Sequence, residues 1–321
     1  MSIALPSGAM RTILERLAAE DAGLPDPTLL PPAEGRLQAA VANRRWNVDL
    51  PEVARVENLA LHGGHVRPMA ARIHVPQGLA GRGAILHIHG GGWAFCDVDT
   101  HERASRMLAI ESGAAVLSFN YRLAPEHPHP AGLQDCVAAW RSLLSGEAGL
   151  KGPFAVAGDS AGANLAIALM LHEASQERTL PDAGLLFYGV YGCDFETASY
   201  REHADGPGLT RAKMMRYWDW YAPGAARRDV LAAPLLAGDG DLAALPPLYL
   251  NAAAIDPLRS DSELLYRRLT AMGRNDRYRL HAGVVHGFMQ MSRELEEARL
   301  AFALAGEAFR SLARSKEDKS I

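Results

Sequence analysis

Short apolar, β-branched runs bounded by glycine and proline recur along the chain, and we interpret each of them as a strand. The runs cover residues 53–61, 66–75, 84–89, 114–120, 154–157, 184–188, 248–253 and 278–281. Between the later runs, apolar residues return at i, i+3, i+4 and i+7, which predicts helices over residues 102–111, 132–144, 161–174, 261–271 and 292–312. This alternation predicts an α/β fold with about eight strands, mostly parallel and flanked by helices. The first two strands should pair antiparallel and make that edge of the sheet antiparallel, because His62-Gly63-Gly64-His65 between them is typical of a hairpin turn.

Two stretches do not fit this alternation, and we interpret them as a helical cap. Residues 1–45 are helical and precede any strand, and residues 189–245 stand between two strands where a crossover needs only a dozen or more residues. The α/β domain would then span residues 46–321. Within the insertion, residues 209–222 form an aromatic helix that contains Trp218 and Trp220. These rings could pack the cap onto the body, the more common role of an aromatic stripe, or wall a site.

Composition narrows the class of protein. The 321 residues, 48% hydrophobic and 22% charged, describe a globular chain with one large core. With 33 basic against 37 acidic residues and a net charge of −4, the chain lacks the basic surface expected of a nucleic-acid-binding protein. The cysteines are odd in number and form no C-x-x-C pair, and no stretch resembles a secretion signal or a membrane span. We therefore expect a cytoplasmic protein without nucleic-acid or membrane partners.

Ser160 is the candidate nucleophile. It lies in Gly158-Asp159-Ser160-Ala161-Gly162, directly after a predicted strand and directly before a predicted helix. This is the context of a nucleophile elbow, a strained turn that exposes the serine oxygen, with flanking glycines that permit close packing. The alternative is a glycine-flanked helix start with Ser160 as its cap, which the position after a strand disfavours.

A second motif, His89-Gly90-Gly91-Gly92, follows another predicted strand. Consecutive glycines let backbone N–H groups point into a cavity and bind an oxyanion, with the amide after the nucleophile as the complementary donor. The alternative is a flexible glycine turn. His87 and His89 also form an H-x-H pair that some metallohydrolases use for zinc, but no further ligand cluster accompanies it. We expect no metal, and we interpret His89 as a structural residue that fixes the glycine loop.

An elbow of this kind predicts an acid and then a histidine, each just past the end of a strand. Asp256 follows the run at 248–253, and His286 follows the run that ends at residue 281. Both lie where the order requires. Asp261 is the second candidate acid, although its place at the start of a helix is explained more simply by capping.

Together these motifs resemble the hormone-sensitive-lipase family of α/β-hydrolases. The resemblance runs from about residue 50 to the end, and it rests on HGGGW, residues 121–128 (YRLAPEHP), GDSAG, DPLR at 256–259 and HGF at 286–288. The family implies an α/β-hydrolase fold with a helical cap. Carried over by motif, Ser160 is the nucleophile, Asp256 the orienting acid and His286 the base. Gly91, Gly92 and Ala161 then form the oxyanion hole, supported by His89, Gly90 and Asp159.

The resulting hypothesis is a bacterial type of carboxylesterase that needs no cofactor. His286 would deprotonate Ser160, which attacks a small soluble ester, and water would release the acyl enzyme. Because aromatic side chains over the catalytic face would exclude long chains, we expect acetyl to butyryl esters as substrates. Hydrolysis of an amide, lactone or carbamate stays open as an alternative, as do a non-catalytic binding role on the same fold and a homodimer.

Overall fold

The computed structural model describes residues 4–62, 68–78 and 83–317, and its centre is an eight-stranded sheet. The order is β1-β2-β4-β3-β5-β6-β7-β8, in which β1 pairs antiparallel with β2 and β2 antiparallel with β4, whereas the pairs from β4 to β8 are parallel. The strands are β1 Arg55–Leu61, β2 Met69–Val75, β3 Ala84–Ile88, β4 Ala115–Phe119, β5 Phe154–Asp159, β6 Ala183–Phe187, β7 Leu248–Ile255 and β8 Arg277–Val285.

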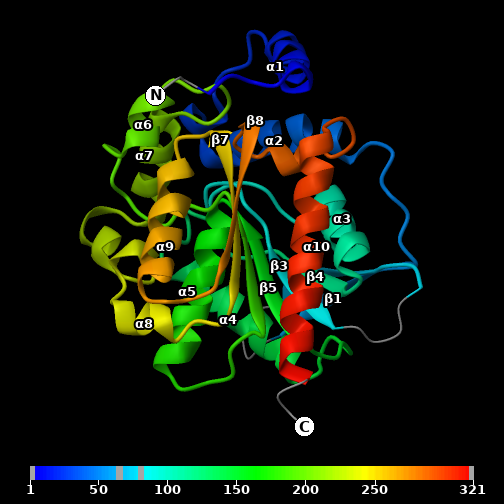
Figure 1. Cartoon of the computed structure of the whole chain (residues 1–321). Coiled ribbons are helices and arrows are strands. Elements are labelled where there is room, and N and C mark those ends of the chain that lie inside the picture. The colour runs from blue at the N-terminus through cyan, green and yellow to red at the C-terminus, as the bar shows by residue number, and fades with distance from the viewer. Residues whose placement is uncertain (1–3, 63–67, 79–82, 318–321) are drawn as a thin grey trace.

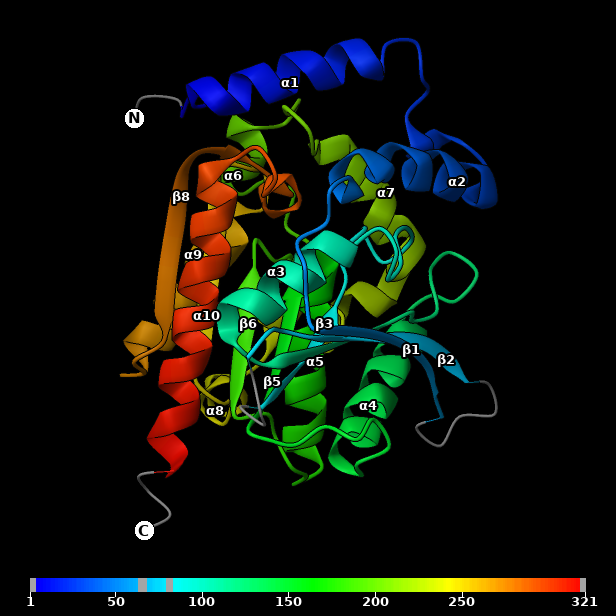
Figure 2. The same cartoon turned by 90° about the vertical axis from the view of Figure 1, so that its right-hand side faces the viewer.

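Helices cover both faces of this sheet (Figures 1 and 2). The α-helices are α1 Gly8–Glu20, α2 Pro32–Asn43, α3 Glu102–Ser112, α4 Ala131–Leu144, α5 Ala161–Ser175, α6 Ala198–Glu202, α7 Arg211–Tyr221, α8 Asp239–Ala243, α9 Arg259–Ala271 and α10 Glu296–Glu317. Short 3₁₀ helices are η1 Pro27–Leu29, η2 Arg44–Asn47, η3 Gly224–Arg228, η4 Pro234–Leu236 and η5 Phe288–Met291.

The α/β fold expected from the sequence is confirmed, with differences at the ends of elements. The antiparallel first pair is also confirmed, although most of its predicted turn lies outside the described residues. The last helix begins at Glu296 rather than at residue 292, because the chain leaves the 3₁₀ helix η5 through a turn over residues 292–294. The last strand is longer than predicted, since it pairs with β7 as far as Val285.

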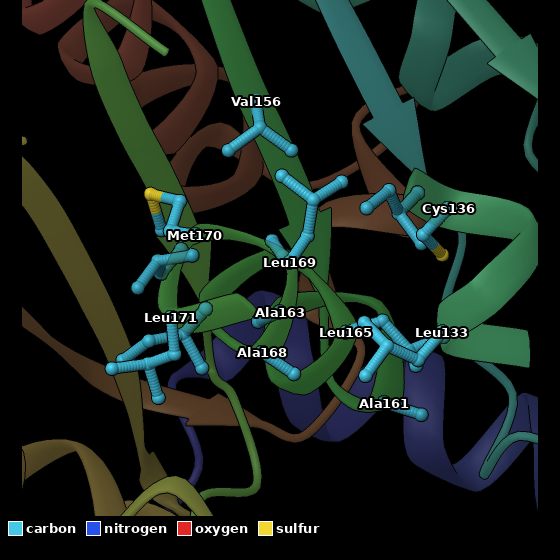
Figure 3. Close-up of a cluster of buried hydrophobic side chains, with 14 of the residues drawn as sticks. Leu133, Cys136, Val156, Ala161, Ala163, Leu165, Ala168, Leu169, Met170 and Leu171 are labelled. Carbon is cyan, nitrogen blue, oxygen red and sulfur yellow. The ribbon is translucent and has the colours of Figure 1, made fainter. Parts of the chain in front are cut away.

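Two apolar clusters hold the helices to the sheet, one on each face. The first contains buried residues of α4, α5 and α9, and the second contains those of α3 and α10. Helix α5 is apolar around nearly its whole circumference, as expected of a helix buried on all sides. Figure 3 shows part of the first cluster, with Leu165, Leu169 and Met170 of α5 near Leu133 of α4 and Val156 of β5. This packing anchors α5, whose first turn carries the candidate site.

Most of the two stretches outside the alternating pattern lies at one end of the molecule, whereas α8, at the end of the insertion, lies at the opposite end. Figures 1 and 2 place α1 and α2 from the N-terminal stretch, and α6 and α7 from the insertion, at the same end. Arg216 of α7 donates to Asp26 over 2.8 Å, which links the two stretches directly. Because the parallel strands end their runs at a common edge, the loops that follow β3, β5, β7 and β8 also meet there.

Candidate active site

Ser160 stands in a sharp turn between β5 and α5. Its backbone has φ +55° and ψ −117°, an unfavourable conformation for a residue with a Cβ. The turn fits because glycines stand two residues before and two residues after Ser160: a Cβ on Gly158 would lie 2.3 Å from the Gly162 oxygen, and one on Gly162 would lie 2.0 Å from the Ile88 oxygen. The close packing expected of the G-x-S-x-G motif is therefore present.

The structure brings the three candidate catalytic residues together. His286 Nε2 lies 2.9 Å from Ser160 Oγ, and His286 Nδ1 lies 2.7 Å from Asp256 Oδ2. Asp256 is fully buried, and its other oxygen accepts the Leu258 amide over 2.8 Å. The ring of Tyr188 packs edge-on against His286 with centroids 5.1 Å apart. These contacts hold one ring nitrogen of the imidazole toward the serine and the other toward a carboxylate.

The second candidate acid, Asp261, has a different place. Its Oδ2 accepts the amides of Tyr191 and Gly192 over 2.7 and 2.9 Å, so it anchors the stretch after β6 instead of contacting His286. Burial raises the pKa of Asp261 to about 7, and the neighbouring charge of Asp256 adds to the rise, against the two amide hydrogen bonds. Of the two carboxylates, only Asp256 orients the histidine.

The glycine loop, residues 90–92, lies next to the serine. Gly91 and Gly92 have φ of +109° and +59°, which glycine adopts at little cost. Within the described part of the chain, no acceptor is bonded to the amides of Gly91, Gly92 or Ala161. The amide of Gly90 is different, because it donates to Asp159 Oδ1 over 3.0 Å. Three amides are thus left without an acceptor, as candidate oxyanion donors must be.

The other predicted supporting residues contact this loop. His89 Nδ1 lies 2.8 Å from the Gly90 oxygen, and its ring stacks on Tyr121 with centroids 4.3 Å apart. Burial lowers the pKa of His89 to about 4, so the ring is neutral. Asp159 is 7% exposed. Burial by itself would raise the pKa of Asp159, but hydrogen bonding and nearby positive charge, from His101 above all, outweigh it and lower this pKa to about 2.

The H-x-H pair is engaged with protein groups. His87 Nδ1 lies 3.0 Å from Ser105 Oγ, whereas His89 Nδ1 faces a backbone oxygen. Burial also lowers the pKa of His87, to about 3. Across the described ranges, no group of three or more histidine, cysteine or carboxylate side chains is arranged to hold a metal ion.

Comparisons with known proteins place this geometry in a family. Residues 85–290 match the sequence profile of the alpha/beta hydrolase fold. The chain belongs to the α/β-hydrolase family. Its motifs and relatives assign it to the hormone-sensitive-lipase group of these hydrolases, as the sequence resemblance implies.

Two curated relatives of this α/β hydrolase come from Mycobacterium tuberculosis. Carboxylesterase NlhH is 38% identical over 65% of this chain and 67% of its own length. Esterase LipI is 35% identical over 74% of this chain and 76% of its own length. A solved ester hydrolase from the metagenome of Lake Arreo, in complex with a derivative of bipyridine phosphonate, superposes with a TM-score of 0.89. It is 32% identical and covers 96% of this chain and 99% of that one.

The active-site cavity of the hydrolase has a volume of about 170 Å³ and lies beside Ser160 and His286. Its apolar lining is made of Val190, Leu209, Met214 and Tyr217, all from the insertion between β6 and β7. Tyr217 lies directly over the glycine loop, since a Cβ on Gly92 would come within 2.6 Å of its ring. Part of the insertion therefore covers the candidate oxyanion hole.

The prediction that Trp218, Trp220 and the neighbouring tyrosines wall this site is wrong for the two tryptophans, whereas Tyr217 does line the cavity. Trp218 is fully buried and meets the Trp93 ring edge-on at 5.1 Å, while Trp220 is half-buried beside Phe95. Neither lines the cavity. Because successive residues of a helix are rotated by about 100°, the face of α7 that carries Met214 and Trp218 docks onto the body, and only Tyr217 at its margin reaches Gly92.

Sequence reasoning missed several residues that the fold adds to the site. Asn43, at the end of α2, lines the cavity, as do Gln290 from η5 and His101 from the turn before α3. None of them belongs to the motifs that located the serine, the acid and the histidine. Nothing in the local sequence places these side chains beside Ser160, because their position depends on how distant segments pack.

Proposed function

We propose that this α/β hydrolase is a carboxylesterase that hydrolyses short-chain acyl esters, from acetyl to butyryl, through a Ser160-His286-Asp256 triad and an acyl-enzyme. The observation that carries the proposal is the continuous hydrogen-bonded array from Asp256 through His286 to Ser160, beside three unengaged backbone amides. Acyl transfer requires a nucleophile, a base with its orienting acid, and oxyanion donors around one point. The names of the relatives, carboxylesterase and esterase, support ester substrates.

The reaction follows from these positions. Neutral His286 accepts the Ser160 proton at Nε2 as the serine oxygen attacks the ester carbonyl, and Asp256 stabilises the imidazolium that forms. The negative oxygen of the tetrahedral intermediate is bound by the amides of Gly91, Gly92 and Ala161. Collapse of the intermediate breaks the ester C–O bond, and the leaving alcohol takes the proton from His286. Water then attacks the acyl-enzyme by the same route.

We also propose that residues 1–45 and 189–245 act as a cap on the α/β domain of residues 46–321. Asn43 from the first segment, and Leu209 and Tyr217 from the second, line the active-site cavity and support this division. Within the described residues no helix is both long and apolar enough to span a bilayer. A cytoplasmic location and a homodimer stay predictions.

Replacement of the nucleophile tests the mechanism. Ser160→Ala should abolish ester hydrolysis and leave the thermal unfolding midpoint nearly unchanged, because the variant loses only the attacking oxygen. Loss of a triad member lowers turnover by about 10⁴- to 10⁶-fold in other serine hydrolases. Rates are measured with p-nitrophenyl acetate on purified protein. Ser175→Ala, at the far end of α5, is the control. More than about a tenth of wild-type turnover in the Ser160 variant would contradict the assignment.

Acyl length tests the substrate proposal. We expect the highest kcat/KM for acetyl to butyryl esters of p-nitrophenol, because a cavity of about 170 Å³ holds a short chain but not a long one. The measurement is kcat/KM over a series from two to twelve acyl carbons. A maximum at eight carbons or more would contradict the proposal, because it would show that the cavity accepts long acyl chains. Matched amides, lactones and carbamates assayed alongside decide between the alternative reactions, and no turnover of any of them would favour a binding role.

A further inference from the structure

A histidine outside the proposed triad, His101, faces the same cavity. It lies in the turn immediately before α3, is 3% exposed, and lines the cavity together with Ser160 and the glycine loop. Its ring packs against that of His89, with centroids 5.5 Å apart. Neither the proposed triad nor the proposed oxyanion hole uses this residue.

His101 reaches the glycine loop through a single carboxylate oxygen. His101 Nε2 lies 3.3 Å from Asp159 Oδ1, and the same oxygen accepts the Gly90 amide over 3.0 Å. A carboxylate oxygen only accepts hydrogen bonds, so His101 stabilises this anion with Nε2 protonated. Nε2 of His101 and the amide of Gly90, which come from different segments, therefore converge on Asp159, the residue that precedes Ser160.

The glycine loop is in direct contact with this carboxylate. A Cβ on Gly90 would lie 2.5 Å from Asp159 Oδ2, so no side chain separates the loop from the acid. Gly91 and Gly92, which carry the free amides, follow at once. A movement of the Asp159 side chain would therefore shift these amides, and oxyanion donors act only within a narrow range of distances. A misplacement of about 1 Å can cost 10²-fold in rate.

The negative charge of Asp159 also affects how readily the oxyanion forms. Asp159 is a nearly buried carboxylate beside the place where negative charge develops during ester attack. An unbalanced anion there would oppose formation of the oxyanion, because like charges repel strongly where water is excluded. Donation from His101 and Gly90 offsets that charge.

We propose that His101 is a positioning residue for the reaction: through Asp159 it holds the glycine loop in place and balances the carboxylate beside the oxyanion hole. The inference rests on the proposed function. It assigns His101 no contact with the substrate, so its effect should appear in the transition state rather than in substrate binding. His101→Phe, which keeps a ring and removes the N–H, should lower kcat about 10- to 100-fold and change KM little.

Two further variants separate this role from simple packing. His101→Gln keeps an N–H donor and should recover a large part of the lost kcat. In the His101→Phe background, the second change Asp159→Asn removes the unbalanced charge but leaves an oxygen that can accept the Gly90 amide. The double variant should therefore be faster than His101→Phe alone. If His101 only fills space, the two losses will add and the double variant will be slower, which overturns the proposal.

The measurements are kcat and KM for p-nitrophenyl acetate, the thermal unfolding midpoint, and the affinity for phenylboronic acid by calorimetry. The boronic acid forms a tetrahedral anionic adduct with a serine oxygen, so its affinity should fall with kcat across the series. His172→Phe, at the far end of α5, is the matched control and should match wild type. If the wild type is active and the His101→Phe variant is equally active, this inference alone is overturned. If the wild type neither hydrolyses esters nor binds the boronic acid, the proposed function is overturned too.

Discussion

At the scale of single residues, backbone clearance decides which positions tolerate change. Gly162 belongs to the first turn of α5, and a Cβ there would meet the Ile88 oxygen at 2.0 Å, whereas Gly240 of α8 has no atom within 4 Å of such a Cβ. Both glycines are helical, so an exchange to alanine has the same intrinsic effect on helix propensity. The difference between the two variants therefore isolates the steric contribution.

We expect Gly162→Ala to lower the free energy of unfolding by about 2–4 kcal/mol, because strand β3 and helix α5 must separate to admit the methyl group. Gly240→Ala should be neutral or stabilising by up to about 1 kcal/mol, since alanine is the better helix former. Urea unfolding of both variants checks this. Equal effects at the two positions would show that the contact between α5 and the end of β3 is not tight.

At the scale of elements, helix α7 both packs onto the body of the protein and lines the cavity proposed to select the acyl chain. Met214, Trp218 and Tyr221 form its buried face, and the Tyr221 ring stacks on Trp93 with centroids 4.0 Å apart. Tyr217 is the only aromatic side chain among the described residues of this helix that lines the active-site cavity. Tyr217 can therefore be shortened while Met214, Trp218 and Tyr221 of the buried face are kept.

Tyr217→Ala should shift the preferred acyl length upward by several carbons, because it removes the ring over Gly92 and enlarges the cavity. Trp220→Ala is the matched control: it removes an aromatic ring from the same helix, at a half-buried position outside the cavity. The series of p-nitrophenyl esters, measured as kcat/KM, gives the comparison. An unchanged profile for the Tyr217 variant would show that this ring does not limit the acyl chain.

Some residues of the candidate site can be located from the sequence, and others cannot. The nucleophile, acid and histidine can be located from sequence because each stands next to the end of a strand and carries a local motif. The aromatic side of α7 cannot, because the choice between Tyr217 and Trp220 depends on how the helix is rotated against Trp93. His101 and Asn43 carry no local signal at all, since α2 and the turn before α3 reach the cavity only through tertiary packing.

At the scale of the whole molecule, stability against acid depends on buried charges such as Glu102, the first residue of α3. Its carboxylate lies 3.0 Å from His74 Nε2 and 2.7 Å from both Arg72 Nη1 and Arg106 Nε. Burial by itself would raise the pKa of Glu102, but these partners outweigh it and lower this pKa from 4.5 to about 2. Because the folded-state pKa is the lower one, Glu102 stabilises the fold above pH 4.5, and this contribution is lost as the pH falls toward 2.

Glu102→Gln should therefore cost about 3 kcal/mol of unfolding free energy at pH 7, and progressively less below pH 4.5. Glu57→Gln is the control, because its ion pair with Arg55 is exposed on both sides and should contribute less than about 1 kcal/mol. Urea unfolding at pH 7, 4 and 3 gives the dependence. A cost that stays constant down to pH 3 would mean that the loss is one of packing and not of charge.

The cavity beside Ser160 is lined by segments that are distant in the chain, among them Asn43 at the end of α2 and Tyr217 of α7. Arg36 ties the N-terminal segment to the body by donating to the Ala94 and Ala124 oxygens over 2.8 Å, and Asp26 ties it to α7 through Arg216. A molecule that contacts both Asn43 and Tyr217 therefore binds more tightly while both segments are docked. At a hundred times its dissociation constant, it would add about 2.7 kcal/mol to the free energy of releasing them. Binding in the cavity would in this way slow proteolytic cleavage of residues 21–31, which connect α1 to α2.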